Sequence, residues 1–138
     1  MAVGFSVHYF WYQVGSGEFL HSFFSTIAYN LENGKWGSRY PIIMRKLYQG
    51  EIESKDINLA IEELEEIRSL LQLISPEKVV WDIEDLSKQP PWGADISEEI
   101  TDLSNYFVTG SGEDLIILLK HALDKAKELK VSLKIDTL

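Results

Sequence analysis

Residues 78–109 read KVVWDIEDLSKQPPWGADISEEITDLSNYFVT, and this stretch predicts two of the strands that lead us to expect an α+β fold. The apolar runs at 79–83 and 105–109 have the length and the β-branched or aromatic content of short strands. Between them, residues 89–93 (QPPWG) predict a rigid turn that carries a large aromatic side chain. Ser97 is placed to cap a short helix. We therefore expect two strands with a shaped, strongly acidic connection between them.

The acidic residues are concentrated in the middle of the chain. The 138 residues carry a net charge of −9, yet residues 51–114 hold 17 acidic and 4 basic side chains, a balance of −13. Residues 1–50 and 115–138 each have a balance of +2. An acidic surface repels nucleic acid and attracts a basic partner, although acids that only keep a surface soluble give the same pattern. We expect no direct binding of nucleic acid.

The N-terminal part predicts a strand and then a helix. Residues 3–12 alternate with a period of two and are rich in aromatic and β-branched side chains, which predicts a single strand in the interior of a sheet. Gly15-Ser16-Gly17 ends this strand. Apolar residues at helical spacing from Phe19 to Leu31 predict the helix that follows.

Three further helices and a final strand are expected. A short helix begins at Pro41, a long one covers 54–74 with Ser54 as its N-cap, and another covers 111–129 with capping-box spacing at Ser111. Residues 131–136 alternate as a half-buried strand. This order predicts one α+β domain over residues 1–138, with a central, mostly antiparallel or mixed sheet packed by about three to four helices.

The sequence gives little support for a metal or cofactor site. There is no cysteine, and His8, His21 and His121 lie far apart on different expected elements. We therefore expect no cofactor and no metal. The N-terminal residues lack the basic region of a secretion signal, and no apolar run is long enough to span a bilayer. We expect a cytoplasmic protein without a membrane partner.

Asp82 and Glu84 are the best candidates for catalysis. On a strand they would share one face and could place two carboxyl groups near one bond. General acid–base chemistry also needs a carboxyl group whose pKa is raised, usually by burial, and an acidic surface run does not indicate such an environment. A small hydrolase or transferase that uses this pair is an alternative, but we expect no enzyme.

The acidic stretch is instead the candidate surface for a protein partner. Trp81 alternates in phase with Val79 and Ile83, so we expect all three in the core, whereas Trp92 suits either the core or a contact surface equally well. Trp and Pro beside charge favour a pre-organised contact surface. The expected partner-binding residues are Asp82, Glu84, Asp85, Trp92, Asp95, Glu98, Glu99 and Asp102.

Four parts of the sequence carry a family resemblance. Residues 79–93 (VVWDIEDLSKQPPWG) and 100–109 (ITDLSNYFVT), with 19–27 (FLHSFFSTI) and 36–41 (WGSRYP), resemble the immunity protein seventy family. These are small bacterial proteins, encoded beside polymorphic or contact-dependent toxins, that protect the producing cell and its kin. The resemblance implies a non-catalytic protein that binds and blocks a cognate toxin C-terminal domain. Because such domains are often basic nucleases, an acidic surface bearing Trp92 fits this function. A general acidic adaptor protein without a toxin is a further alternative.

Overall fold

An antiparallel sheet forms one layer of the molecule. A computed structural model describes residues 2–137, which form four strands in the order β2-β1-β4-β3. β1 (Val3–Val7) lies between β2 (Phe10–Gly15) and β4 (Leu133–Thr137), and the short β3 (Glu51–Ile52) pairs with the other edge of β4. The sheet and the helices together confirm the predicted α+β fold class.

The single strand predicted over residues 3–12 is wrong, because the chain reverses there and forms the β1–β2 hairpin. Val7 pairs with Phe10, and His8 and Tyr9 make the turn. His8 has a φ of 55°, in the left-handed region that His enters more often than most other non-glycine residues. The turn contains no Gly, Asn or Pro, so the alternating pattern passes through it without a visible break. β1 does lie inside the sheet, as predicted.

The three long helices predicted from periodicity are confirmed; the first begins two residues earlier than predicted, and the other two are shorter than predicted. They are α1 (Gly17–Leu31), α2 (Ile57–Leu71) and α3 (Leu115–Leu129). The short helix expected after Pro41 is present as the π-helix η1 (Ile42–Leu47). The expected final strand is β4, which begins two residues later than predicted.

Two of the predicted N-caps are wrong. Ser54 begins a 3-10 turn, η2 (Ser54–Asp56), and makes no capping bond for α2. At α3 the cap is Asp114, whose Oδ1 accepts hydrogen bonds from the backbone N–H groups of Ile116 and Ile117. Asp114 takes over because its side chain reaches two of the N–H groups that a helix start leaves unpaired.

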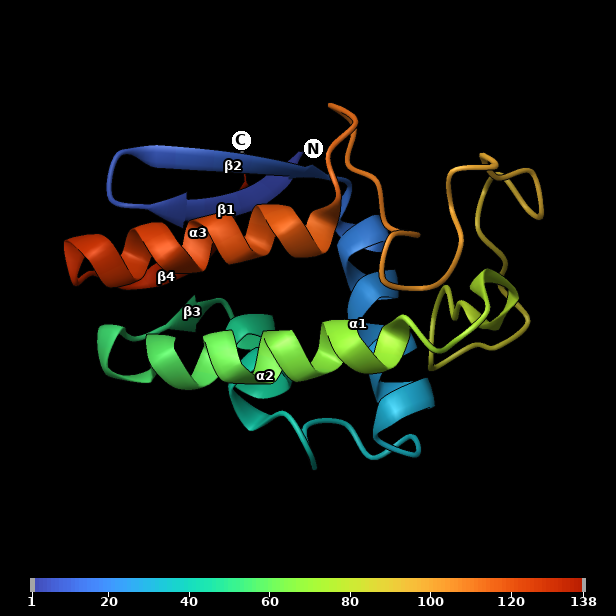
Figure 1. The fold of residues 1–138 in the computed structure, drawn as a ribbon, viewed down its shortest axis with the longest axis horizontal. Helices are drawn as coiled ribbons and strands as arrows, with labels where there is room; N and C mark the ends of the chain where they lie inside the picture. Colours follow the sequence, from blue (N-terminus) through green and yellow to red (C-terminus); the bar gives the residue numbers. More distant parts are fainter. Residues whose placement is uncertain (1, 138) are drawn as a thin grey trace.

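The hydrophobic core lies between the sheet and the helices. Figure 1 shows α2 and α3 side by side, with α1 running across near the end of α2 and the start of α3. α3 packs against β1 and β2. Phe5 of the sheet, Phe23 of α1, Leu64 of α2 and Leu119 of α3 are all fully or almost fully buried.

The chain between α2 and α3 contains little regular structure. Its one helical turn in the described residues is η3 (Pro76–Lys78). The strands predicted at 79–83 and 105–109 are not formed, apart from an isolated bridge between Val108 and Asp114, and the short helix expected at Ser97 is absent. In Figure 1 this part of the chain loops out at the right of the view.

Candidate functional site

Backbone groups of residues 80–83 form hydrogen bonds with side-chain hydroxyl groups of α1, and not with a neighbouring strand. Thr26 Oγ1 accepts a hydrogen bond from the Val80 N–H at 3.0 Å and donates to the Val80 carbonyl at 3.1 Å. Ser22 also donates to this carbonyl, at 2.9 Å, and Ser25 accepts from the Ile83 N–H at 3.2 Å. Because buried backbone groups need partners, these contacts let residues 80–83 lie against α1 without joining the sheet. The sequence signal for them is the group of three hydroxyl residues, Ser22, Ser25 and Thr26, among the apolar side chains of α1.

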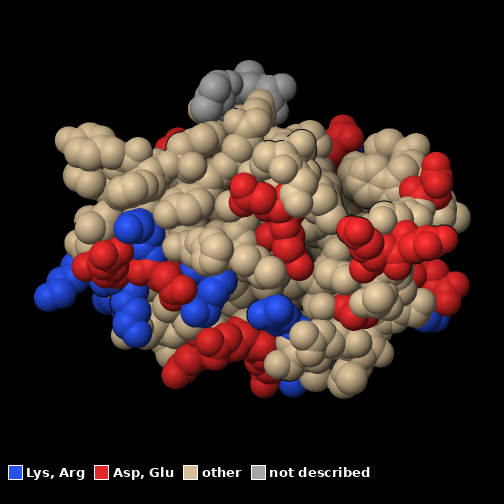
Figure 2. Space-filling view, turned by 45° about the horizontal axis from the view of Figure 1, so that its top comes forward, with Lys and Arg blue, Asp and Glu red and all other residues tan. Residues whose placement is uncertain are grey.

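This contact fixes the start of residues 82–102, which we name the acidic segment. It contains seven acidic residues and one basic residue, Lys88. Figure 2 shows acidic side chains spread over the right of the molecule, where the segment lies, whereas many of the visible Lys and Arg side chains lie at the left. The eight predicted partner-binding residues all belong to this segment.

The two tryptophans pack against each other but differ in exposure. Trp81 is buried, as predicted, although its neighbour Val80 is buried too, while Val79 and Ile83 are only half-buried. Trp92 keeps 38% of its surface exposed. The two rings meet edge to face, with centroids 5.5 Å apart. Trp92 is therefore partly packed against the fold and partly exposed to solvent.

Tyr106 holds the Trp92 ring in place. The indole N–H of Trp92 donates to the Tyr106 hydroxyl at 2.8 Å. Burial raises the pKa of Tyr106, so this hydroxyl stays neutral and can accept the bond at physiological pH. The sequence reading did not single out Tyr106, because only the fold brings it next to the diproline turn.

Asp82 is held by contacts within the chain. The backbone N–H of Glu84 donates to its Oδ1 at 2.9 Å, His21 Nε2 lies 3.4 Å from Oδ1, and Lys88 Nζ lies 3.6 Å from Oδ2. The bond from Glu84 is the main cause that lowers the pKa of Asp82, with smaller contributions from His21 and Lys88. A carboxyl with a lowered pKa is a poor general acid. The strand that would align Asp82 with Glu84 is also absent.

Asp85 and Asp102 are held in local turns. Asp85 Oδ1 accepts from both the hydroxyl and the backbone N–H of Ser87, which lowers its pKa. Burial acts to raise the pKa of Asp102, but hydrogen bonds from Ser104 and Thr101 outweigh it, and the pKa is lowered. These aspartates therefore stabilise local turns of the acidic segment and also give its surface negative charge.

The other four predicted carboxylates face solvent. Glu84, Asp95, Glu98 and Glu99 are exposed, and within residues 2–137 no hydrogen bond or ion pair holds their carboxylate groups. Their charges are therefore available to a partner without breaking an internal contact. The predicted carboxylates thus form two groups. Asp82, Asp85 and Asp102 make contacts within the chain, and the other four face solvent.

A hollow of about 200 Å³ lies beside Trp92. Its walls are mostly apolar, and Asp95 is the charged residue among those that line it. A second hollow, of about 280 Å³, adjoins the same turn and is lined by Pro76, Val79, Pro90 and Tyr106 among others. The residues that line the first hollow are Phe19, Trp92, Asp95, Ile96, Ser97, Ile100, Tyr106 and Val108.

An aromatic cluster borders the acidic segment on its other side. The rings of His21 and Trp36 stack with centroids 5.9 Å apart, and the Tyr48 hydroxyl lies 3.4 Å from His21 Nδ1. Glu84 and Arg45 help to line the hollow of about 300 Å³ next to them. His21 and Trp36 are 15 residues apart in the sequence, so only the fold brings their rings together.

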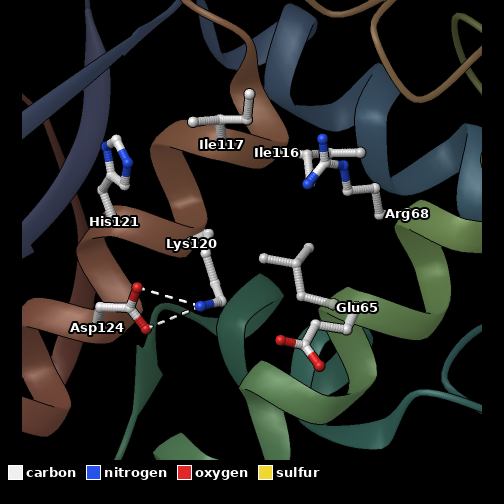
Figure 3. Close-up of a pocket in the computed structure, with 8 residues that line it drawn as sticks. Glu65, Arg68, Ile116, Ile117, Lys120, His121 and Asp124 are labelled. Atoms are coloured by element: carbon white, nitrogen blue, oxygen red, sulfur yellow. Dashed lines mark hydrogen bonds and ion pairs between the residues drawn. The ribbon is translucent and has the colours of Figure 1, made fainter.

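A hollow of about 470 Å³ lies between α2 and α3, away from the acidic segment. Figure 3 shows Glu65 and Arg68 from α2 facing Lys120 and Asp124 from α3. Lys120 is paired with Asp124 at 3.1 Å. With acids and bases balanced on its walls, this hollow favours neither an anion nor a cation.

No group of three or more His, Asp or Glu side chains in residues 2–137 is arranged to hold a metal ion. No helix in this part of the chain is both long and apolar enough to cross a membrane.

The comparisons with known proteins agree with the resemblance in the sequence. No curated protein and no solved structure matches the chain. A family model described as Immunity protein 70 matches residues 5–135. This range includes the three long helices and the whole acidic segment. Members of immunity families typically act as non-enzymatic inhibitors of a cognate toxin. The chain belongs to the Immunity protein 70 family.

Proposed function

We propose that the protein neutralises its cognate toxin by binding a basic toxin domain, a nuclease, through the acidic segment. The observation that carries this proposal is the set of solvent-facing carboxylates of the acidic segment, Glu84, Asp95, Glu98 and Glu99, together with the partly exposed Trp92. A nuclease binds phosphate groups with basic side chains, and an acidic surface complements such a site. Binding there would block access of the nucleic acid.

The way in which the segment is held supports this proposal. Irregular connections longer than about 12–15 residues are usually either functional or disordered. This one is fixed by the α1 hydroxyls at its start and by the contact between Trp92 and Tyr106. A surface that is already ordered loses less conformational entropy on binding, which improves affinity.

The catalytic alternative loses support from the geometry, whereas the adaptor differs from the proposed function in its range of partners. A hydrolase or transferase built on Asp82 and Glu84 would need one carboxyl with a raised pKa, whereas that of Asp82 is lowered. A general acidic adaptor would bind many basic proteins and would not require a particular toxin.

The test is inhibition of the toxin domain encoded by the neighbouring gene. Purified toxin domain is assayed for cleavage of DNA and RNA while the protein is titrated, with unrelated basic nucleases as controls. We expect stoichiometric inhibition of the cognate domain and none of the controls. If the cognate domain stays fully active, the proposal is wrong, and equal inhibition of all the nucleases would favour the adaptor.

A further inference from the structure

The hollow beside Trp92 has the composition of a receptor for one long basic side chain. Its volume of about 200 Å³ is below the roughly 300–1,000 Å³ of pockets for small-molecule ligands, so it suits a single side chain. Trp92 and Val108 line it and remain 38% and 44% exposed. Apolar walls of this kind pack against the methylene groups of Lys or Arg, while the charged end reaches toward water or a carboxylate.

The charge around the hollow favours a cation. Asp95 lines the hollow, no basic residue is among the residues that line it, and Glu98 and Glu99 lie between its lining residues Ser97 and Ile100 in the chain. The carboxylate of Asp95 has no hydrogen bond or ion pair within residues 2–137. The face of an indole ring also attracts a cation.

Trp92 is fixed as a wall of this hollow. Its N–H is bonded to Tyr106, and its ring packs against Trp81. To swing outward and insert into a partner, the ring would have to break both contacts. The geometry therefore favours a site in which a side chain of the partner enters and Trp92 stays in place.

We infer that this hollow receives a lysine or arginine side chain of the toxin domain, with its aliphatic part against Trp92 and Val108 and its charged group at Asp95. This inference rests on the proposed function and specifies it. In this arrangement Trp92 receives an anchoring side chain from the partner and does not supply one.

The experiment measures the dissociation constant for the toxin domain by calorimetry with two variants. Val108→Trp fills the hollow, and Asp95→Asn removes its charge while keeping its shape. The matched controls are Leu73→Trp and Glu62→Gln, which make the same kinds of change at exposed positions outside the acidic segment. We expect each hollow variant to weaken binding by about tenfold or more, and each control by less than about threefold.

A double-mutant cycle then tests the contact itself. Each exposed Lys and Arg of the toxin domain is changed to Ala and titrated with the wild-type protein and with Asp95→Asn. For the toxin residue that contacts Asp95, we expect that once this residue is changed to Ala, Asp95→Asn weakens binding no further. Circular dichroism checks that Val108→Trp is folded, and the exposed Asp95→Asn gives an independent result.

The outcomes separate the inference from the proposed function. If both hollow variants bind as tightly as the wild type while reversing several charges of the segment abolishes binding, the inference is wrong and the proposed surface stands. If the wild-type protein does not bind the toxin domain, both are wrong. Equal losses in the hollow variants and their controls would also overturn the inference.

Discussion

Trp81 and Trp92 show how two residues of one type differ in role. Trp81 is 9% exposed and packs in the core, so Trp81→Ala should lower the free energy of unfolding by about 3–5 kcal/mol. Trp92→Phe keeps an aromatic ring but removes the N–H that Tyr106 accepts, and should cost only about 1 kcal/mol. Urea unfolding of the two variants measures both values. Equal unfolding midpoints for Trp81→Ala and the wild type would contradict the burial of Trp81.

The local hydrogen bonds of Asp85 predict an effect of pH. The pKa of Asp85 is lowered from its ordinary value of 3.8 in the folded protein, mainly by the hydroxyl of Ser87. Its stabilising contribution is therefore complete above about pH 3.8 and is lost as the pH falls through the lowered pKa. In the Ser87→Ala variant, we expect the pKa of Asp85 to move up toward 3.8. Carbon-detected NMR titration of the Asp85 carboxyl measures this shift, with Asp95, which lies away from Ser87 in the sequence, as the internal control.

At the scale of elements, the packing of α1 against residues 80–83 decides the form of the acidic segment. Thr26→Val keeps the shape of the side chain but leaves the Val80 N–H without its acceptor. Removing one partner of a buried hydrogen bond costs roughly 1–3 kcal/mol. We expect faster hydrogen exchange at the Val80 amide and lower stability.

Thr26→Ser is the matched control, because it keeps the hydroxyl and loses only a methyl group. Its Val80 amide should exchange nearly as slowly as in the wild type. If Thr26→Val and Thr26→Ser behave alike, the hydroxyl does not hold the segment.

The same contact explains which elements the sequence could predict. Helical periodicity is local to each helix, so α1, α2 and α3 were predictable from their own residues. The apolar run at 79–83 has the composition of a strand, but its backbone partners are side chains more than 50 residues earlier in the chain. Hydrophobic periodicity and strand propensity are properties of the run itself, so they carry no information about such distant partners.

The candidate site, too, was only partly predictable from the sequence. Its acidic character and its aromatic turn are visible in the sequence, because both depend on composition alone. Which acids face solvent is not visible, since Asp82 meets His21 of α1 and Asp102 meets Ser104 only in the folded loop. The hollow beside Trp92 likewise requires Phe19 and Val108, which the sequence does not bring together.

At the scale of the whole molecule, charge is separated along its length. The acidic segment lies at one end, and the C-terminal part of α3, with Lys125, Lys127 and Lys130, lies toward the other (Figures 1 and 2). An asymmetric field of this kind orients an approaching basic partner and raises its association rate. Salt weakens this steering, because the Debye length falls from about 30 Å at 0.01 M to about 8 Å at 0.15 M.

The structure also indicates which charges of the acidic segment can be reversed without breaking contacts inside it. Reversing Asp82 or Asp85 would break internal contacts, whereas Glu84, Asp95 and Glu98 face solvent. The triple variant with Lys at these three positions should therefore melt like the wild type. A control variant with Lys at Glu51, Glu62 and Asp136 makes the same change in net charge at exposed positions outside the segment.

The most direct test is the association rate constant with the toxin domain, measured by stopped flow at 0.01 M and 0.15 M salt for the three proteins. We expect the wild type and the control variant to associate at least about tenfold faster at low salt. The segment variant should associate slowly and depend little on salt. Equal rates and equal salt dependence for the segment variant and the wild type would contradict the claim that the acidic segment binds the toxin.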